Sequence, residues 1–209
     1  MSAHVSEPRL LVLHGLRLKG FTEPCPLAAL IALAEDAVED ELAALESAGF
    51  VLHREGRLTG WALTRDGRSE HERVLAAEVD AVGCRAEVDK GYRRFLDLNR
   101  ALLEVCTDWQ MRDETTLNDH HDAAYDAGVI DRLADIHARV TPIADDLAAH
   151  LARYAGYAPR LTAALERLRG GESDYFTRPI IDSYHTVWFE LHEDLLATLG
   201  LERSKEEAP

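Results

Sequence analysis

Four arginines in the first part of the chain have the chemistry needed to bind a polyanion. Arg54 and Arg57 flank the expected turn of a β-hairpin and Arg65 and Arg68 follow it, so we expect the four guanidinium groups to converge on one small region. Such a hairpin can enter a minor groove or straddle the phosphates of duplex DNA. The alternative is an ordinary set of surface arginines that keep an exposed hairpin soluble. With Thr59 they form the candidate DNA-binding set.

A second group of candidate residues is mostly aromatic and lies in the C-terminal half. On the last expected helix, His185 and His192 fall within the apolar face, because successive helical residues are rotated by about 100°. One interpretation is an interior cavity, lined by imidazoles, Trp188 and Tyr184, that holds a small-molecule effector. The other is a core whose histidines pair with carboxylates or backbone carbonyls. The candidate ligand-binding residues are Trp109, His120, His121, Tyr125, His137, Arg178, Tyr184, His185, Trp188 and His192.

Arg178 follows an aromatic pair, Tyr175 and Phe176, just before the expected start of the last helix. A guanidinium group there can anchor a carboxylate or a phosphate. It can equally form an ion pair with Asp174 or Asp182, and the sequence does not decide between these roles.

Metal and catalytic motifs give little signal. His185 and His192 are seven residues apart, which is about 10 Å along a helix and too far for both to bind one ion. The adjacent His120 and His121 lie in no H-E-x-x-H or comparable spacing. No nucleophile elbow, phosphate-binding glycine loop or dinucleotide motif occurs. We therefore expect no metal, no other cofactor and no catalytic residue, although an unfamiliar enzyme is not excluded.

The stretch 27–68 contains the elements that position the arginines. Apolar residues recur at helical spacing over 35–48, and Gly49 follows where a left-handed cap belongs. Two short apolar runs within 50–63 flank a charged, glycine-containing turn, a pattern that predicts a β-hairpin. A further helix is expected to begin near Arg68.

This order of helix, tight turn, helix, hairpin and helix resembles the winged helix-turn-helix of MarR-like and PadR-like bacterial transcription regulators. The resemblance rests on the Gly-Phe-Val sequence at 49–51 and the Leu-Thr-x-x-Gly-Arg sequence at 63–68, and it covers about the first third of the chain. It implies that the helix over 35–48 is a recognition helix. It also implies that the helix over 8–19 packs behind it and contributes to a dimer interface.

The expected recognition helix departs from the family pattern in its charge. It carries no Lys or Arg, and acids there oppose an approach to phosphates unless one accepts a hydrogen bond from cytosine. The alternative is a solvated helix face with favourable acids at its N-terminus. The acids are Glu35, Asp36, Glu39, Asp40, Glu41 and Glu46.

The whole chain is acidic, with a net charge of −15 over 209 residues. Residues 1–75 carry 8 Lys and Arg against 12 Asp and Glu, a net of −4, and residues 76–209 carry 15 against 26, a net of −11. Such a chain repels phosphates at long range, so any contact with nucleic acid must come from a local basic patch.

The cellular compartment is predicted from three features of the sequence. No apolar run is long enough to span a bilayer, and the first residues lack the parts of a signal peptide. Cys25, Cys84 and Cys106 are widely spaced and form no C-x-x-C pair, which indicates reduced thiols. We expect a cytoplasmic protein without a membrane partner.

The fold class predicted from these patterns is mainly α with a small β-hairpin wing. We expect a winged helix over 1–72, a linking helical tract over 73–107 with a bend near Gly83 or Gly91, and an all-α domain over 108–209 for dimerisation or ligand binding.

Three details of the all-α domain are predicted. Residues 108–128 read as a loop with short helical turns. Pro142 is expected to kink its helix or to begin a second one, and Pro179 to begin the last helix.

These patterns favour a DNA-binding transcription regulator that forms a homodimer on an operator and senses a small-molecule effector. A ligand in the His/aromatic cavity would shift the helical tract over 69–106 and with it the spacing of two winged helices. The alternative is a winged-helix protein-docking module joined to a small-molecule-binding or catalytic helical domain in a metabolic or biosynthetic pathway.

Overall fold

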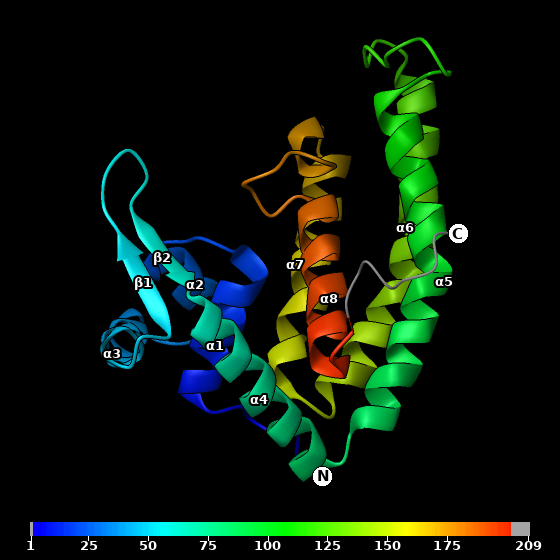
Figure 1. Ribbon diagram of the computed structural model, residues 1–209. Coiled ribbons are helices and arrows are strands. Elements are labelled where there is room, and N and C mark those ends of the chain that lie inside the picture. The colour runs from blue at the N-terminus through cyan, green and yellow to red at the C-terminus, as the bar shows by residue number, and fades with distance from the viewer. Residues whose placement is uncertain (1, 202–209) are drawn as a thin grey trace.

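A computed structural model describes residues 2–201 and shows a mainly helical protein with one two-stranded antiparallel sheet (Figure 1). The predicted class, mainly α with a small β-hairpin, is confirmed at this level. The N-terminal elements are α1 (Pro8–Lys19), α2 (Pro24–Ile31), α3 (Glu35–Ser47), β1 (Val51–Arg54), β2 (Gly60–Leu63) and α4 (Arg65–Val82). The C-terminal elements are α5 (Arg85–Gln110), α6 (Ala123–Ala148), the 3-10 helix η1 (Ala152–Gly156), α7 (Tyr157–Arg169), the 3-10 helix η2 (Ser173–Tyr175) and α8 (Tyr184–Leu199).

The hairpin follows from local chemistry at both of its ends. Gly49 has a φ of 78°, which lets the chain turn from α3 into β1. At the other end, the Thr64 hydroxyl caps α4 by accepting a hydrogen bond from the Gly67 amide at 3.0 Å, and it donates to the Gly49 carbonyl at 2.8 Å. Thr64 therefore ties the start of α4 to the end of α3.

Gly67 is required by close packing. A β-carbon added at Gly67 would lie 1.8 Å from the carbonyl oxygen of Phe50, so any side chain would force the backbone apart. We expect Gly67→Ala to lower the free energy of unfolding by about 3 kcal/mol, as overpacking against backbone does. Urea denaturation followed by circular dichroism measures the loss.

Gly128 provides the matched control for that substitution. It lies in α6, where an added β-carbon meets nothing within 4 Å. Gly128→Ala is expected to stabilise the protein by about 0.5–1 kcal/mol, because alanine is the better helix former. Equal effects at the two positions would contradict the role given to Gly67.

Two hydrophobic cores form, and α4 contributes to both. The N-terminal core centres on Leu13, Leu27 and Leu42 and includes Val74 of α4 at its edge. The C-terminal core joins α5–α8 and includes Val79, from the last turns of α4. Helix α4 thus crosses from one core to the other. The domain boundaries predicted at residues 72 and 107 stay predictions.

The long helices α5 and α6 form an antiparallel pair at one side of the molecule (Figure 1). The hairpin and α3 lie at the opposite side, and α7 and α8 lie between them. The helical tract breaks at Gly83, whose φ of 70° ends α4, whereas Gly91 lies inside α5. None of the described helices is both long enough and apolar enough to cross a bilayer.

The expected loop over 108–128 and the expected helix start at Pro142 are wrong, whereas the alternative, a kink at Pro142, stays a prediction. Helix α6 begins at Ala123 because Asp122 caps it by accepting from the Tyr125 amide, so the loop is 111–122 and not 108–128. Helix α6 then runs through Pro142 without ending. The hydroxyl of Thr141, just before the proline, donates to the His137 carbonyl at 2.9 Å.

The start of the last helix was also predicted wrongly. Helix α8 begins at Tyr184 and not at Pro179. Ile180 has a φ of 77°, which is incompatible with a helix, and the Ser183 hydroxyl provides the cap by accepting from the Thr186 amide. A capping serine placed four residues after the proline decided the boundary.

Candidate functional site

The predicted DNA-binding arginines lie at the two ends of the hairpin. Arg54 ends β1 and Arg57 lies in the turn, whereas Arg65 and Arg68 lie in the first turn of α4, and all four are exposed, as is Thr59. The four-residue strand β2 separates the two pairs by about 13 Å of extended chain. The expectation that all four converge on one small region is therefore wrong, because the extended strand holds the tip pair (Arg54 and Arg57) away from the base pair (Arg65 and Arg68).

The tip and base pairs differ from nearby arginines in having no carboxylate partner. Arg9 and Arg73 both lie within 4.0 Å of Glu70. None of the four hairpin arginines forms an ion pair within residues 2–201, and the adjacent Leu58 is 73% exposed at the turn. The hairpin thus presents unneutralised positive charge to solvent.

Helix α3 presents the opposite charge beside the hairpin (Figure 1). Its buried face is Val38, Leu42 and Leu45, as predicted. Of the six acids, Glu41 is half-buried and the other five are exposed. The carboxylate of Asp36 accepts from the Ala37 amide at 2.8 Å, a favourable contact at a helix N-terminus. A negative face therefore adjoins the positive hairpin.

The predicted ligand-binding residues do not share one cavity. His185, Trp188 and His192 line a groove of about 190 Å³ between α5 and α8, and the Trp188 indole donates to Asn99 Oδ1 at 2.9 Å. Tyr184 is fully buried and lies outside the lining of that groove. Pockets for drug-sized ligands measure about 300–1,000 Å³, so this groove suits only a smaller molecule.

His137 and Tyr184 form a separate contact between α6 and α8. The Tyr184 hydroxyl lies 3.4 Å from His137 Nδ1, and the hydroxyls of Thr141 and Thr162 lie 3.5 and 3.4 Å from His137 Nε2. Burial lowers the pKa of His137. The contacts of this histidine ring are therefore with hydroxyl groups, whereas the alternative interpretation expected carboxylates or backbone carbonyls.

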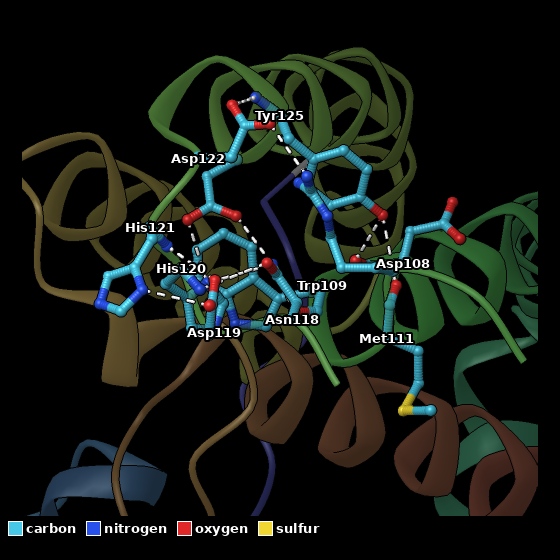
Figure 2. Close-up of polar contacts among 11 residues, drawn as sticks. Asp108, Trp109, Met111, Asn118, Asp119, His120, His121, Asp122 and Tyr125 are labelled. Carbon is cyan, nitrogen blue, oxygen red and sulfur yellow. Dashed lines mark hydrogen bonds and ion pairs between the residues drawn. The ribbon is translucent and has the colours of Figure 1, made fainter. Parts of the chain in front are cut away.

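The remaining aromatic candidates gather at the loop that joins α5 to α6. Figure 2 shows Asn118 among Trp109, His120 and Asp122. The Asn118 side-chain amide donates to the Trp109 carbonyl at 3.1 Å and to Asp126 Oδ1 at 2.8 Å. His120 Nδ1 lies 3.0 Å from Asp126 Oδ2. These contacts lock the loop onto the helix ends.

Two further candidates close the same loop (Figure 2). His121 pairs with Asp119 at 3.1 Å, and the Tyr125 hydroxyl donates to the carbonyls of Asp108 and Met111 at 2.9 and 3.3 Å. Their polar atoms bind residues of the loop and of the helix ends beside it, so both side chains have a structural role here. Within residues 2–201 no group of three or more metal-binding side chains is assembled.

Arg178 is an exposed ion-pair partner of Asp174, one of the two acids the sequence offered. The other acid, Asp182, accepts two hydrogen bonds from Arg160 at 2.8 and 2.9 Å. Arg178 therefore does not reach the α5–α8 groove, and the ion-pair interpretation describes its contacts.

A buried ionic seam between α1 and α8 was missed by the sequence analysis. Glu190, Glu193 and Asp194 lie on the acid-bearing face of α8, yet all three are buried. They pair with basic residues of α1. Glu190 lies 2.5 Å from Lys19, Glu193 lies 3.4 Å from Arg17, and Asp194 lies 3.0 Å from His14. The signal was present as two rows with helical spacing, but nothing in the sequence pairs segments so far apart.

Asp194 is the centre of the seam. It accepts from the Tyr157 hydroxyl at 2.9 Å and the Thr198 hydroxyl at 3.1 Å, and Arg153 lies 3.6 Å away. Burial by itself would raise the pKa of Asp194, but His14, Arg153 and the Tyr157 hydrogen bond together hold it well below its ordinary range. The carboxylate is therefore ionised at neutral pH, although it is fully enclosed.

The seam continues into α4 and the chain that precedes α7. His14 Nδ1 lies 2.9 Å from His71 Nε2, and Arg153 of η1 binds Glu78 of α4 at 2.5 Å. Burial, aided by His14, lowers the pKa of His71 to about 3. The seam thus joins the N-terminal elements to the C-terminal helices through charged and titratable groups.

Comparison of the chain with protein-family models, with curated proteins and with solved structures finds no match. Its function must therefore be inferred from the arrangement described above.

Proposed function

We propose that this protein is a DNA-binding transcription regulator whose N-terminal elements act as a winged helix-turn-helix. The observation that carries the proposal is the set of four exposed hairpin arginines without carboxylate partners in the described chain. Neutralising phosphates with such groups releases counterions, and this term supplies most of the affinity for duplex DNA. The order α2, α3, hairpin and α4 supports the winged-helix assignment.

The spacing of the two arginine pairs favours binding led by the hairpin. The tip pair can enter a minor groove, which is about 6 Å wide, while the base pair faces the phosphates beside it. The exposed acids of α3 oppose a deep approach of that helix to the major groove. Contacts from one copy are few, so we include a homodimer on a two-fold operator in the proposal.

A small-molecule effector belongs to the same proposal. The α5–α8 groove is its site, because three of the candidate residues, His185, Trp188 and His192, line it. Its volume and its indole and imidazole walls suit a small aromatic or aliphatic molecule.

Fluorescence anisotropy with labelled duplex tests the proposal directly. The duplexes are the protein's own upstream DNA and an unrelated sequence, each at a low and a high salt concentration. We expect binding that weakens steeply with salt, because each neutralised phosphate adds about 0.9 to the slope of log affinity against log salt. Absence of binding at low salt would overturn the proposal.

Arginine variants test whether the hairpin makes the contact with DNA. Arg54→Ala combined with Arg57→Ala removes the tip pair, and we expect a lower salt slope by about 2. Arg100→Ala combined with Arg139→Ala removes two exposed arginines of α5 and α6 and serves as the matched control. An equal change in both double variants would show that only net charge matters.

A second function is favoured by α3. Five exposed acids on one short helix without a basic residue suit a basic protein partner better than a polyanion. In that case the N-terminal elements form a protein-docking module and the C-terminal helices a small-molecule-binding or catalytic domain of an assembly.

A further inference from the structure

The buried side-chain atoms without a hydrogen-bond partner in the described chain all lie in one place. They are His14 Nε2, His71 Nδ1, Glu78 Oε1 and Arg153 Nε. Buried polar groups in proteins are nearly always bonded, so four exceptions in one cluster require an explanation. All four belong to the ionic seam between the two cores.

Three of these atoms face an opposite charge without the alignment of a hydrogen bond. His14 Nε2 lies 3.0 Å from Asp194, Glu78 Oε1 lies 3.2 Å from His4, and Arg153 Nε lies 3.6 Å from Asp194. His71 Nδ1 differs, because no ion pair or hydrogen bond within residues 2–201 involves it. The open end of the cluster is therefore the His71 ring.

The protonation of the pair follows from Asp194. An ionised carboxylate only accepts, so His14 carries its proton on Nε2, toward Asp194. His14 Nδ1 and His71 Nε2 lie 2.9 Å apart, and a hydrogen bond between two ring nitrogens holds one proton. A second proton on His71 creates an imidazolium against the His14 ring, in a side chain that is 1% exposed.

Among the described residues, Asp194 favours such an imidazolium, but other cations of the seam already lie against this carboxylate. Every cation of the seam already faces an acid, and Asp194 already faces His14 and Arg153. The charged groups that act on His71 are His14 and Arg17 of α1, Arg153 of η1 and Asp194 of α8. The elements packed against the two rings also carry Lys19 of α1, Glu70 and Glu78 of α4, Tyr154 of η1, Tyr157 and Arg160 of α7, and Glu190 and Glu193 of α8, and His4 lies beside Glu78.

We propose that the seam is a proton-linked latch. With His71 neutral it holds α1 and α4 against η1, α7 and α8, and it opens about Gly83 when His71 takes up a proton. Gly83 is suited to this movement because it is exposed, has a φ of 70° and forms the connection between α4 and α5. The latch does not depend on DNA binding.

The sign of the pH dependence follows from the two states of His71. Its pKa is about 3 in the closed seam, because burial and His14 disfavour the charged ring, and returns to an ordinary value near 6.5 when water reaches it. The closed state is therefore fully favoured above about pH 6.5, and the ratio of open to closed molecules rises by up to about tenfold for each pH unit below that.

The native thiols report the opening. Cys84 follows Gly83 and is 3% exposed, near Arg153 and Glu78, whereas Cys106 lies in the C-terminal core. Cys25 is exposed and would react at once, so it is replaced by serine. The labelling then comes from the two buried thiols alone. The reagent is 4,4′-dithiodipyridine, and the ratio of the two labelling rates cancels the pH dependence of thiol chemistry common to both.

We expect the rate at Cys84 relative to Cys106 to rise by about tenfold or more between about pH 7 and about pH 5. His71→Gln cannot take up a proton and should give a ratio that does not change with pH. His121→Gln removes an exposed histidine and should keep the wild-type response.

Parallel labelling of Cys84 and Cys106 at every pH would mean global unfolding only and would overturn the latch. A pH-independent ratio in the protein with His71, or an unchanged response in His71→Gln, would overturn it equally. If His71→Gln exposes Cys106 at neutral pH, this variant has unfolded. The pH dependence of the labelling ratio in the protein with His71 then decides whether the latch exists.

Discussion

Asp194→Ala is expected to lower the free energy of unfolding by about 3–5 kcal/mol, the usual cost of removing one partner from a buried ion pair. The carboxylate is 1% exposed and faces His14 at 3.0 Å and Arg153 at 3.6 Å. Without it Glu78 is the carboxylate that still pairs with the Arg153 guanidinium, and the hydroxyls of Tyr157 and Thr198 lose a carboxylate acceptor. Urea denaturation at neutral pH measures the loss.

Asp146→Ala is the matched control, because this acid pairs with Arg94 at 2.6 Å but is largely exposed. Exposed pairs contribute about 0–1 kcal/mol, so the control should change stability little. Similar losses at Asp146 and Asp194 would show that the seam contributes no more than a surface ion pair. A larger loss at Asp194 that diminishes in strong acid would agree with a carboxylate whose pKa is held low, since its stabilisation is present above its ordinary pKa of about 3.9 and is lost below it.

Neutralising the exposed face of α3 should strengthen binding to duplex DNA by about tenfold at low salt, if the protein binds DNA through the neighbouring hairpin. The change combines Asp36→Asn, Glu39→Gln and Asp40→Asn, three exposed acids without Lys or Arg on their helix. Each carboxylate near a phosphate costs about 0.5 kcal/mol in water at a separation of 8 Å, and three together give about that factor. Anisotropy with the same duplexes measures it.

Neutralising three acids elsewhere provides the control for net charge. Asp131→Asn, Asp135→Asn and Asp145→Asn lie on the exposed side of α6 and should change affinity far less. If the α3 variant binds no better than the parent protein, α3 does not approach the DNA. If neither binds at all, the docking function is favoured, and the α3 variant should then lose its basic partner.

Local patterns predicted the N-terminal elements because their signals lie within a few residues of one another. Gly49, Thr64 and Gly67 each act on neighbours in the hairpin, and the structure gives each a contact that its type requires. The proline positions failed for the opposite reason. Helix α6 continues through Pro142, and the cap at Ser183, not Pro179, sets the start of α8.

The candidate site could be predicted only in part. The exposure of the hairpin arginines and of the α3 acids followed from periodicity, but their spacing needed the extended strand. The seam could not be predicted, because Arg17 and Glu193 are 176 residues apart and an acidic helix face is normally solvated. The ligand candidates were grouped by residue type, whereas the fold distributes them among a groove, a hydroxyl contact and a loop.

The path of α4 has a mechanical consequence for the hairpin. Its 18 residues run from the hairpin base, past the His14–His71 contact, to Gly83, a length of about 27 Å. A tilt of about 10° at the glycine would carry the far end, with Arg65 and Arg68, through about 5 Å, more than the 3.4 Å rise of one base pair. Helix α4 thus acts as a lever arm that pivots at Gly83. A small rotation there becomes a shift of Arg65 and Arg68 by more than one base pair.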